Sequence, residues 1–195
     1  MEFKNLTFEN LMRDADNFSV SDTDSYIEVY SEFLKYFESV NLIEKHHLFI
    51  SSHFVYGWMP TIIHLDTDPS LISQVLFYLN AAKSGHILQI EEFEIVKSCI
   101  NNSMVGLSKL LHFINPRDFA IWDSRILKYL TGNKSQYGID KAENYLAYLQ
   151  KLTEIIHHND YADLHLMIEG QLKYKITPMR AIELLMFETE RNREK

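Results

Sequence analysis

The sequence predicts an all-α protein, because apolar residues recur at helical spacing along most of its length and no stretch alternates long enough to form a strand. The clearest case is residues 25–40, where apolar side chains follow one another every three or four positions. In residues 44–58 apolar side chains lie nearly all round the expected helix, which predicts a central, buried helix. At 195 residues, the chain fits one compact multi-helix domain, or two lobes of about residues 1–100 and 101–195 around a central helix-hairpin-helix at 104–131.

Start and stop signals set the limits of the predicted helices. Asp66-Thr-Asp-Pro69 is typical of a helix start, since proline is accepted in the first turn. Acidic residues at 91–94 suit the positive end of the following helix. The predicted helices cover residues 2–13, 25–40, 44–58, 69–84, 91–100, 104–114, 122–131, 139–157, 160–172 and 178–187, with a charged tail from Glu188.

The stretch from Met104 to Leu130 predicts a hairpin of two helices. Val105-Gly106 is expected to open a turn, because glycine tolerates the positive φ of tight connections. Asn115-Pro116 ends the first helix, since proline disfavours the helical conformation of the residue before it. Asp123-Ser124 is typical of an N-cap pair at the start of the second helix. The hairpin therefore places a lysine of its first helix near a carboxylate at the start of its second.

The run Phe119-Ala-Ile-Trp122 is entirely apolar, so it is expected to be buried and to fix the position of Asp123. This pattern, Val105-Gly106-x-x-Lys109 and then Ile121-Trp122-Asp123-Ser124-Arg125-Ile126, resembles the helix-hairpin-helix DNA glycosylase superfamily, in the branch with an 8-oxoguanine DNA glycosylase-like fold. The resemblance implies that Lys109 is the amine nucleophile and Asp123 the assisting carboxylate. The chain departs from the usual pattern at Ser103-Met104, in the spacing of the lysine, and at Arg125, where many members carry histidine.

Composition and charge limit the location and the partners. A single cysteine, Cys99, excludes an internal disulfide, and no signal peptide or membrane-length apolar run is found, so a cytoplasmic protein without membrane contact is expected. The net charge is −8, which disfavours a general nucleic-acid binder. Residues 1–50 hold ten acidic and four basic residues, whereas residues 104–135 hold five basic and two acidic ones. The positive charge therefore lies on the motif, as expected for local contact with the phosphate of DNA or of a free nucleotide.

Several other side chains are candidates for substrate binding, each beside a purely structural alternative. His112 lies one turn after the lysine and is expected either to touch a substrate or to pack inside the hairpin. Tyr56 and Trp58 are candidates for stacking on a flipped base, although aromatic residues in an apolar run are more often core. Gly106, Arg125 and Lys128 complete the predicted binding set. The nine histidines form no recognisable ligand pattern, so no metal and no cofactor are expected.

The chemistry that the resemblance implies needs these residue types. Breaking an N-glycosidic bond develops positive charge at C1′, which a fixed carboxylate stabilises. An amine attacking C1′ must be neutral, so the lysine would need a lowered pKa, and its Schiff base would permit strand cleavage by β-lyase chemistry. Three hypotheses follow. They are a DNA glycosylase of base excision repair, a nucleoside or nucleotide N-glycosidase on the same fold, and a non-catalytic binding or regulatory relative, for example in phage defence.

Overall fold

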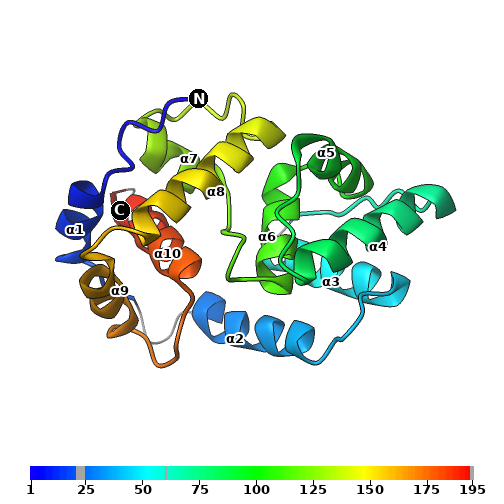
Figure 1. Ribbon diagram of the computed structural model, residues 1–195, viewed down its shortest axis with the longest axis horizontal. Helices are drawn as coiled ribbons and strands as arrows, with labels where there is room; N and C mark the ends of the chain where they lie inside the picture. Colours follow the sequence, from blue (N-terminus) through cyan, green and yellow to red (C-terminus); the bar gives the residue numbers. More distant parts are fainter. Residues whose placement is uncertain (21–24, 60, 194–195) are drawn as a thin grey trace. The chain divides into compact units, whose positions relative to one another are not determined.

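Ten α-helices lie in the part of the chain that the computed structural model describes, which is residues 1–20, 25–59 and 61–193 (Figure 1). Outside helices, these residues form one isolated antiparallel bridge, Leu65 with Ile100, so the all-α prediction is confirmed. No helix in the described ranges has the length and apolar character needed to cross a lipid bilayer.

The chain divides into two units, and each contains five of the helices. Residues Asp24–Phe119 form the inserted unit, and Met1–Thr23 with Ala120–Lys195 form the terminal unit. The inserted unit contains α2 (Ser25–Glu38), α3 (Lys45–Trp58), α4 (Pro69–Lys83), α5 (Ile90–Cys99) and α6 (Met104–Ile114). The terminal unit contains α1 (Phe8–Ala15), α7 (Ser124–Thr131), α8 (Ala142–Ile156), α9 (Tyr161–Glu169) and α10 (Pro178–Arg193).

Helix α6 is the central helix of the inserted unit and contacts α2, α3, α4 and α5 (Figure 1). All of its residues except Val105 are buried. The predicted turn at Val105-Gly106 is wrong, because the hydroxyl of Ser103 accepts a hydrogen bond from the Gly106 N–H at 3.3 Å and caps a helix that already begins at Met104. The predicted stop is confirmed, since the helix ends at Ile114 and Asn115 follows as its C-cap.

Helix α10 is the central helix of the terminal unit and contacts α1, α7, α8 and α9. The expected charged tail from Glu188 is instead helical to Arg193, and Glu188 and Glu190 are 6% and 3% exposed. Their burial is possible because Glu188 pairs with Arg191 at 3.1 Å and Glu190 pairs with Arg193 at 2.5 Å.

The inserted unit ends at Phe119, and the terminal unit resumes at Ala120. The N-terminal residues belong with the C-terminal helices because the backbone N–H and the side-chain amide of Asn5 donate to the carbonyls of Leu130 and Tyr129, at 3.3 and 2.9 Å. The Tyr129 hydroxyl in turn donates to Asp14 of α1 at 2.8 Å. The two arms of the predicted hairpin, α6 and α7, therefore belong to different units.

Candidate functional site

The segment Ala120–Trp122 is held in the core of the terminal unit by tyrosines of α8. Tyr145 donates a hydrogen bond to the Ala120 carbonyl at 2.8 Å, and Tyr148 donates to the Ile121 carbonyl at 3.3 Å. The indole N–H of Trp122 donates to the Ile139 carbonyl at 2.8 Å, and the Trp122 side chain is fully buried. The prediction that this run is core is confirmed, and the next residue, Asp123, follows a rigid segment.

Asp123 caps the N-terminus of α7, as its sequence position predicts. Its Oδ1 accepts hydrogen bonds from the backbone N–H groups of Arg125 and Ile126, both at 3.0 Å. The cap uses one carboxylate oxygen for both bonds, and the positive end of the helix stabilises the negative charge. Asp123 is only partly exposed, so its carboxylate has a fixed direction and a partly desolvated environment.

The charge of Asp123 acts on a buried hydroxyl of the same unit. Burial raises the pKa of Tyr148 well above its ordinary value, and the carboxylates of Glu183 and Asp123 raise it further. Tyr148 is therefore a neutral hydroxyl that donates to the backbone of the segment before the cap.

A pocket of about 480 Å³ lies beside the first turns of α7. Its lining consists of Ser124, Arg125, Lys128, Lys134, Gln136 and Arg193. Two of these side chains belong to the predicted binding set, Arg125 and Lys128. Arg193 comes from the end of α10, which is distant in sequence, so local sequence patterns gave no signal for it. Lys134 was part of the basic stretch, but nothing in the sequence placed its side chain at a pocket.

Ion pairs organise the cations of this pocket. Glu190 forms an ion pair with Lys128 at 3.0 Å and with Arg193 at 2.5 Å, and the Glu190 side chain is 4% exposed. The Arg125 guanidinium lies over the ring of Phe187, 5.0 Å from its centroid. A buried carboxylate thus fixes two of the four cations, and an aromatic ring orients a third.

Lys109, the predicted nucleophile, is a residue of α6 in the inserted unit. Its side chain is 5% exposed, which is unusual for a lysine, and its neighbours on the helix are mostly apolar and buried. Lys109 and Asp123 are assigned to different units, so the fold of neither unit alone brings them together.

His112 is fully buried in the inserted unit and uses both ring nitrogens in hydrogen bonds. Its Nδ1 lies 2.7 Å from the Phe119 carbonyl and its Nε2 lies 2.8 Å from the Tyr30 hydroxyl. Because a carbonyl only accepts, Nδ1 donates its proton to Phe119. The geometry therefore agrees with the structural alternative, a packed histidine that joins α2 to the chain after α6.

Tyr56 and Gly106 contact each other inside the inserted unit. A Cβ at Gly106 would lie 2.6 Å from Cζ of Tyr56 and closer still to its hydroxyl, so glycine is required there by the tyrosine. Tyr56 is 2% exposed and donates to the Ile100 carbonyl at 3.3 Å. Trp58 is partly exposed and packs edge-on against Phe33 and Phe113, with centroids 6.0 and 5.4 Å away. Of these three, Trp58 alone has exposed surface for a substrate.

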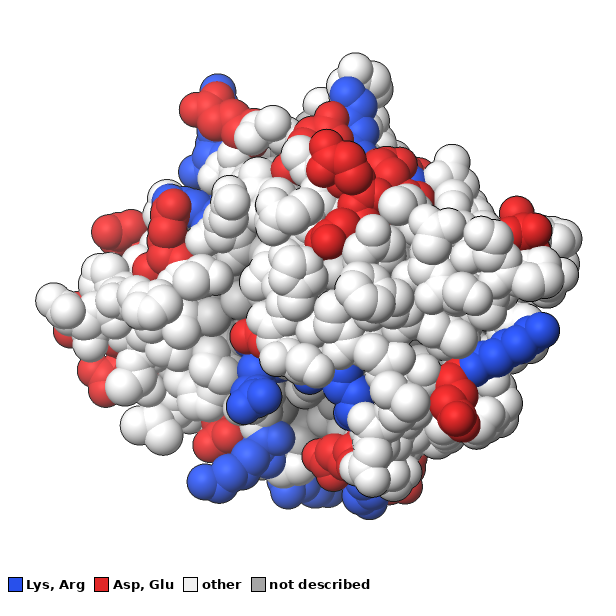
Figure 2. All heavy atoms as spheres, turned by 45° about the vertical axis from the view of Figure 1, so that its right-hand side comes forward, with Lys and Arg blue, Asp and Glu red and all other residues white. Residues whose placement is uncertain are grey.

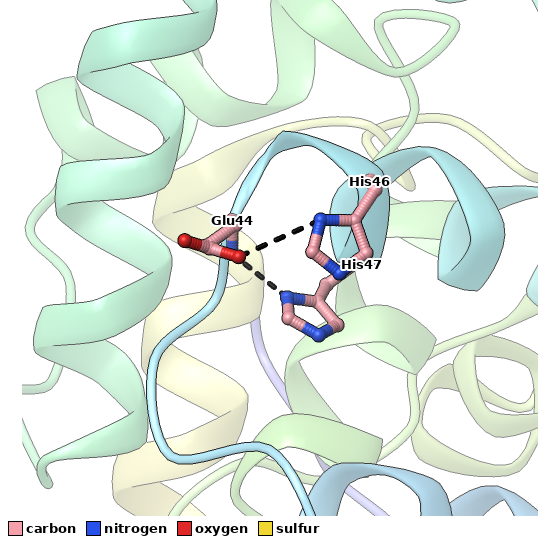
Figure 3. A group of neighbouring side chains, drawn as sticks. All are labelled: Glu44, His46 and His47. Carbon is pink, nitrogen blue, oxygen red and sulfur yellow. Dashed lines mark hydrogen bonds and ion pairs between the residues drawn. The ribbon is translucent and has the colours of Figure 1, made fainter.

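Glu44, His46 and His47 at the start of α3 are the one group among the described residues whose ligand atoms could hold a metal ion, all within 4.8 Å of one another (Figure 3). Glu44 lies 3.6 Å from Nδ1 of His46. However, Nδ1 of His47 accepts the Glu44 backbone N–H at 3.0 Å in a reciprocal capping box. A metal on that nitrogen would replace the cap at the positive end of a helix, so helix capping accounts for this cluster.

The terminal unit thus brings together Asp123, Arg125 and Lys128, and the inserted unit contains Lys109, His112, Gly106, Tyr56 and Trp58. Arg125 and Lys128 of the first set line a pocket. Comparison of the chain with protein-family models, with curated proteins and with solved structures finds no match.

Proposed function

We propose that this protein cleaves the N-glycosidic bond of a nucleotide that carries a modified or damaged base, with Asp123 as the essential carboxylate. The observation that carries the proposal is the fixed position of Asp123, which caps α7, the helix whose Ser124, Arg125 and Lys128 line a pocket with four cations. Cleavage of this bond develops positive charge on the sugar, and a preorganised carboxylate stabilises that charge without reorganising. Cations beside it suit the phosphate of the same nucleotide.

Lys109 has the second role in this proposal. As an amine nucleophile it would attack C1′, release the base and form a Schiff base, after which β-elimination would cleave the strand. If water attacks instead, Asp123 alone supports base release and Lys109 is dispensable for that step. The two routes give different products from the same substrate, so they are separable by experiment.

The substrate we propose first is a base in DNA, as in a DNA glycosylase of base excision repair. The net charge of −8 and the pairing of Lys128 and Arg193 with Glu190 favour a second candidate, N-glycosidic cleavage of a free nucleotide. Both candidates use the same carboxylate and the same pocket.

Replacement of Asp123 by Asn tests the proposal. The amide keeps the shape and can cap the helix, but it lacks the negative charge, so single-turnover base release should fall by about 10²–10³-fold. The assay would follow base release from a panel of modified oligonucleotides and free nucleotides. Asp68→Asn is the matched control, because Asp68 also caps a helix by accepting two backbone N–H groups, from Ser70 at 3.0 Å and Leu71 at 2.9 Å. Equal rates in wild type and Asp123→Asn on every substrate would leave only a binding or regulatory role.

Lys109→Gln separates the two routes. With an amine nucleophile, borohydride trapping disappears and base release falls steeply, whereas with water attack base release survives and only strand cleavage is lost. Lys97→Gln is the matched control, because Lys97 is also 5% exposed in the inserted unit and pairs with Glu94 at 2.7 Å. Loss of trapping in both variants would indicate damage to the fold rather than loss of a nucleophile.

A further inference from the structure

We propose that the pocket at α7 and the end of α10 binds the phosphate group of one nucleotide-sized ligand rather than the backbone of a long duplex. The pocket is lined by Ser124, Arg125, Lys128, Lys134, Gln136 and Arg193. Its volume of about 480 Å³ lies in the range of pockets for small ligands. That the ligand is a nucleoside phosphate rests on the second candidate of the proposed function, a free nucleotide, whereas phosphate binding rests on the pocket alone.

The charge at the pocket suits a single anion. Four cations line it, and two carboxylates, Glu190 and Asp14, pair with some of them. A phosphate monoester carries a charge of about −1.5 to −2 near neutral pH, which suits a small site lined by four cations. Ser124 and Gln136 supply neutral polar groups for the remaining phosphate or sugar oxygens.

Glu190 has a specific part in this arrangement. It is 3% exposed and holds Lys128 and Arg193 in fixed positions, which reduces the side-chain entropy that these cations lose when an anion binds. Its charge also competes with the anion for the same two cations. An amide in its place would keep hydrogen-bonding capacity while removing the competing charge.

A long duplex needs more positive charge than this pocket provides. Proteins that neutralise about six to ten phosphates show a steep loss of affinity with salt. On the face drawn in Figure 2, Lys and Arg side chains gather along the lower edge with a few acidic side chains among them, and wide areas above that edge carry neither charge. The pocket by itself fits contact with one phosphate and its nucleotide.

Calorimetric titration of the full chain tests the proposal with three probes: inorganic phosphate, adenosine 5′-monophosphate and a 12-base-pair duplex. We expect the monophosphate to bind more tightly than inorganic phosphate. For the monophosphate, the slope of log K against log salt concentration should be about −1. A duplex that is bound through many phosphates would give a slope of about −5 or steeper. Tighter binding of the duplex with that steep slope would overturn the proposal.

Two variants place the binding in this pocket. Lys134→Gln should weaken monophosphate binding by about three- to tenfold, as expected for one exposed charge–charge contact, and Glu190→Gln should strengthen it. Lys151→Gln is the matched control, because Lys151 is an exposed lysine that pairs with Glu154 outside the pocket. An unchanged affinity in Lys134→Gln, or a loss equal to that of Lys151→Gln, would place the phosphate elsewhere. If Glu190→Gln does not fold, the Lys134→Gln and Lys151→Gln pair decides the result.

The binding titrations and the base-release assay test two different proposals, and either one can fail without the other. Base release without monophosphate binding would overturn this inference and leave the role of Asp123 standing. If the monophosphate binds in the pocket but no base is released from any substrate, this inference is supported and the catalytic proposal is overturned.

Discussion

Helices α6 and α10 are each the central helix of their unit, but they bury different kinds of side chain. Each contacts four other helices of its own unit and is buried along most of its length. The buried residues of α6 are mostly apolar, with Ser108, Lys109 and His112 as the polar ones, whereas α10 buries four charged residues, Arg180, Glu183, Glu188 and Glu190. A central helix can therefore be stabilised by apolar packing or by charges that are paired in the core, and the sequence pattern reveals the first far more readily than the second.

The difference also changes how each helix should respond to substitution. An apolar interior tolerates changes that conserve volume and shape. A buried ion pair depends on both partners, because removing one leaves the other charged and desolvated.

The largest effect is expected at Glu183 of α10. Glu183 is 1% exposed and forms an ion pair with Arg180, which is 4% exposed. Glu183→Ala should lower the free energy of unfolding by about 3–5 kcal/mol, measured by urea denaturation, because it removes a partner of a buried guanidinium. Glu154→Ala, which breaks the exposed pair with Lys151, should change it by less than about 1 kcal/mol. Equal effects at the two positions would contradict the contrast between the helices.

The next effect is expected at Gly106 of α6, where shape rather than charge is decisive. Gly106→Ala should destabilise the protein by about 1–3 kcal/mol, because the new methyl group overlaps Tyr56. Gly57→Ala is the matched control, since a Cβ there meets no atom within 4 Å, and it should raise stability by up to about 1 kcal/mol through helix propensity. In a Gly106→Ala background, Tyr56→Leu should restore part of the lost free energy of unfolding. If Tyr56→Leu instead lowers the free energy of unfolding further and additively, the two residues do not contact.

The smallest effect concerns the capping box of α3, where a titratable side chain accepts the hydrogen bond. Burial lowers the pKa of His47 below its ordinary value of 6.5, and His46 lowers it further, while Glu44 raises it. His47 therefore binds a proton more readily in the unfolded chain than in the folded protein. The stability that the capping hydrogen bond contributes is fully present above pH 6.5 and is lost as the pH falls through the lowered pKa. The loss should be at most about 1 kcal/mol, the value of a helix cap.

Urea denaturation at pH 7.5 and pH 5.0 measures this effect. His47→Gln keeps an acceptor at the same helical position without a titrating group, so its stability should depend less on pH than that of the wild type. An unchanged pH dependence in this variant would show that protonation of His47 does not affect the cap.

Local sequence signals predicted most of the helices and their ends. Asn115-Pro116 ends α6 and Asp123 caps α7 because both effects need only neighbouring backbone groups. The apolar run before Asp123 is buried as predicted, because no solvated face was available to it. Some local predictions were wrong. The helix predicted at 2–13 begins only at Phe8, where the Thr7 side chain caps it. Gly106 lies in a helix because its small size serves Tyr56, and residues after Glu188 remain helical because distant and nearby cations pair with the acids.

Periodicity and residues within one helical turn were enough to predict the all-α class, the buried segment at 119–122 and the carboxylate that opens α7. Long-range contacts were needed to join the N-terminal residues to the C-terminal helices and to end the inserted unit at Phe119. They also placed Arg193 beside Arg125 and Lys128 in one pocket and Glu190 between two cations. These contacts join positions far apart in the chain, and their energies depend on burial and pairing, which have no local periodicity in the sequence.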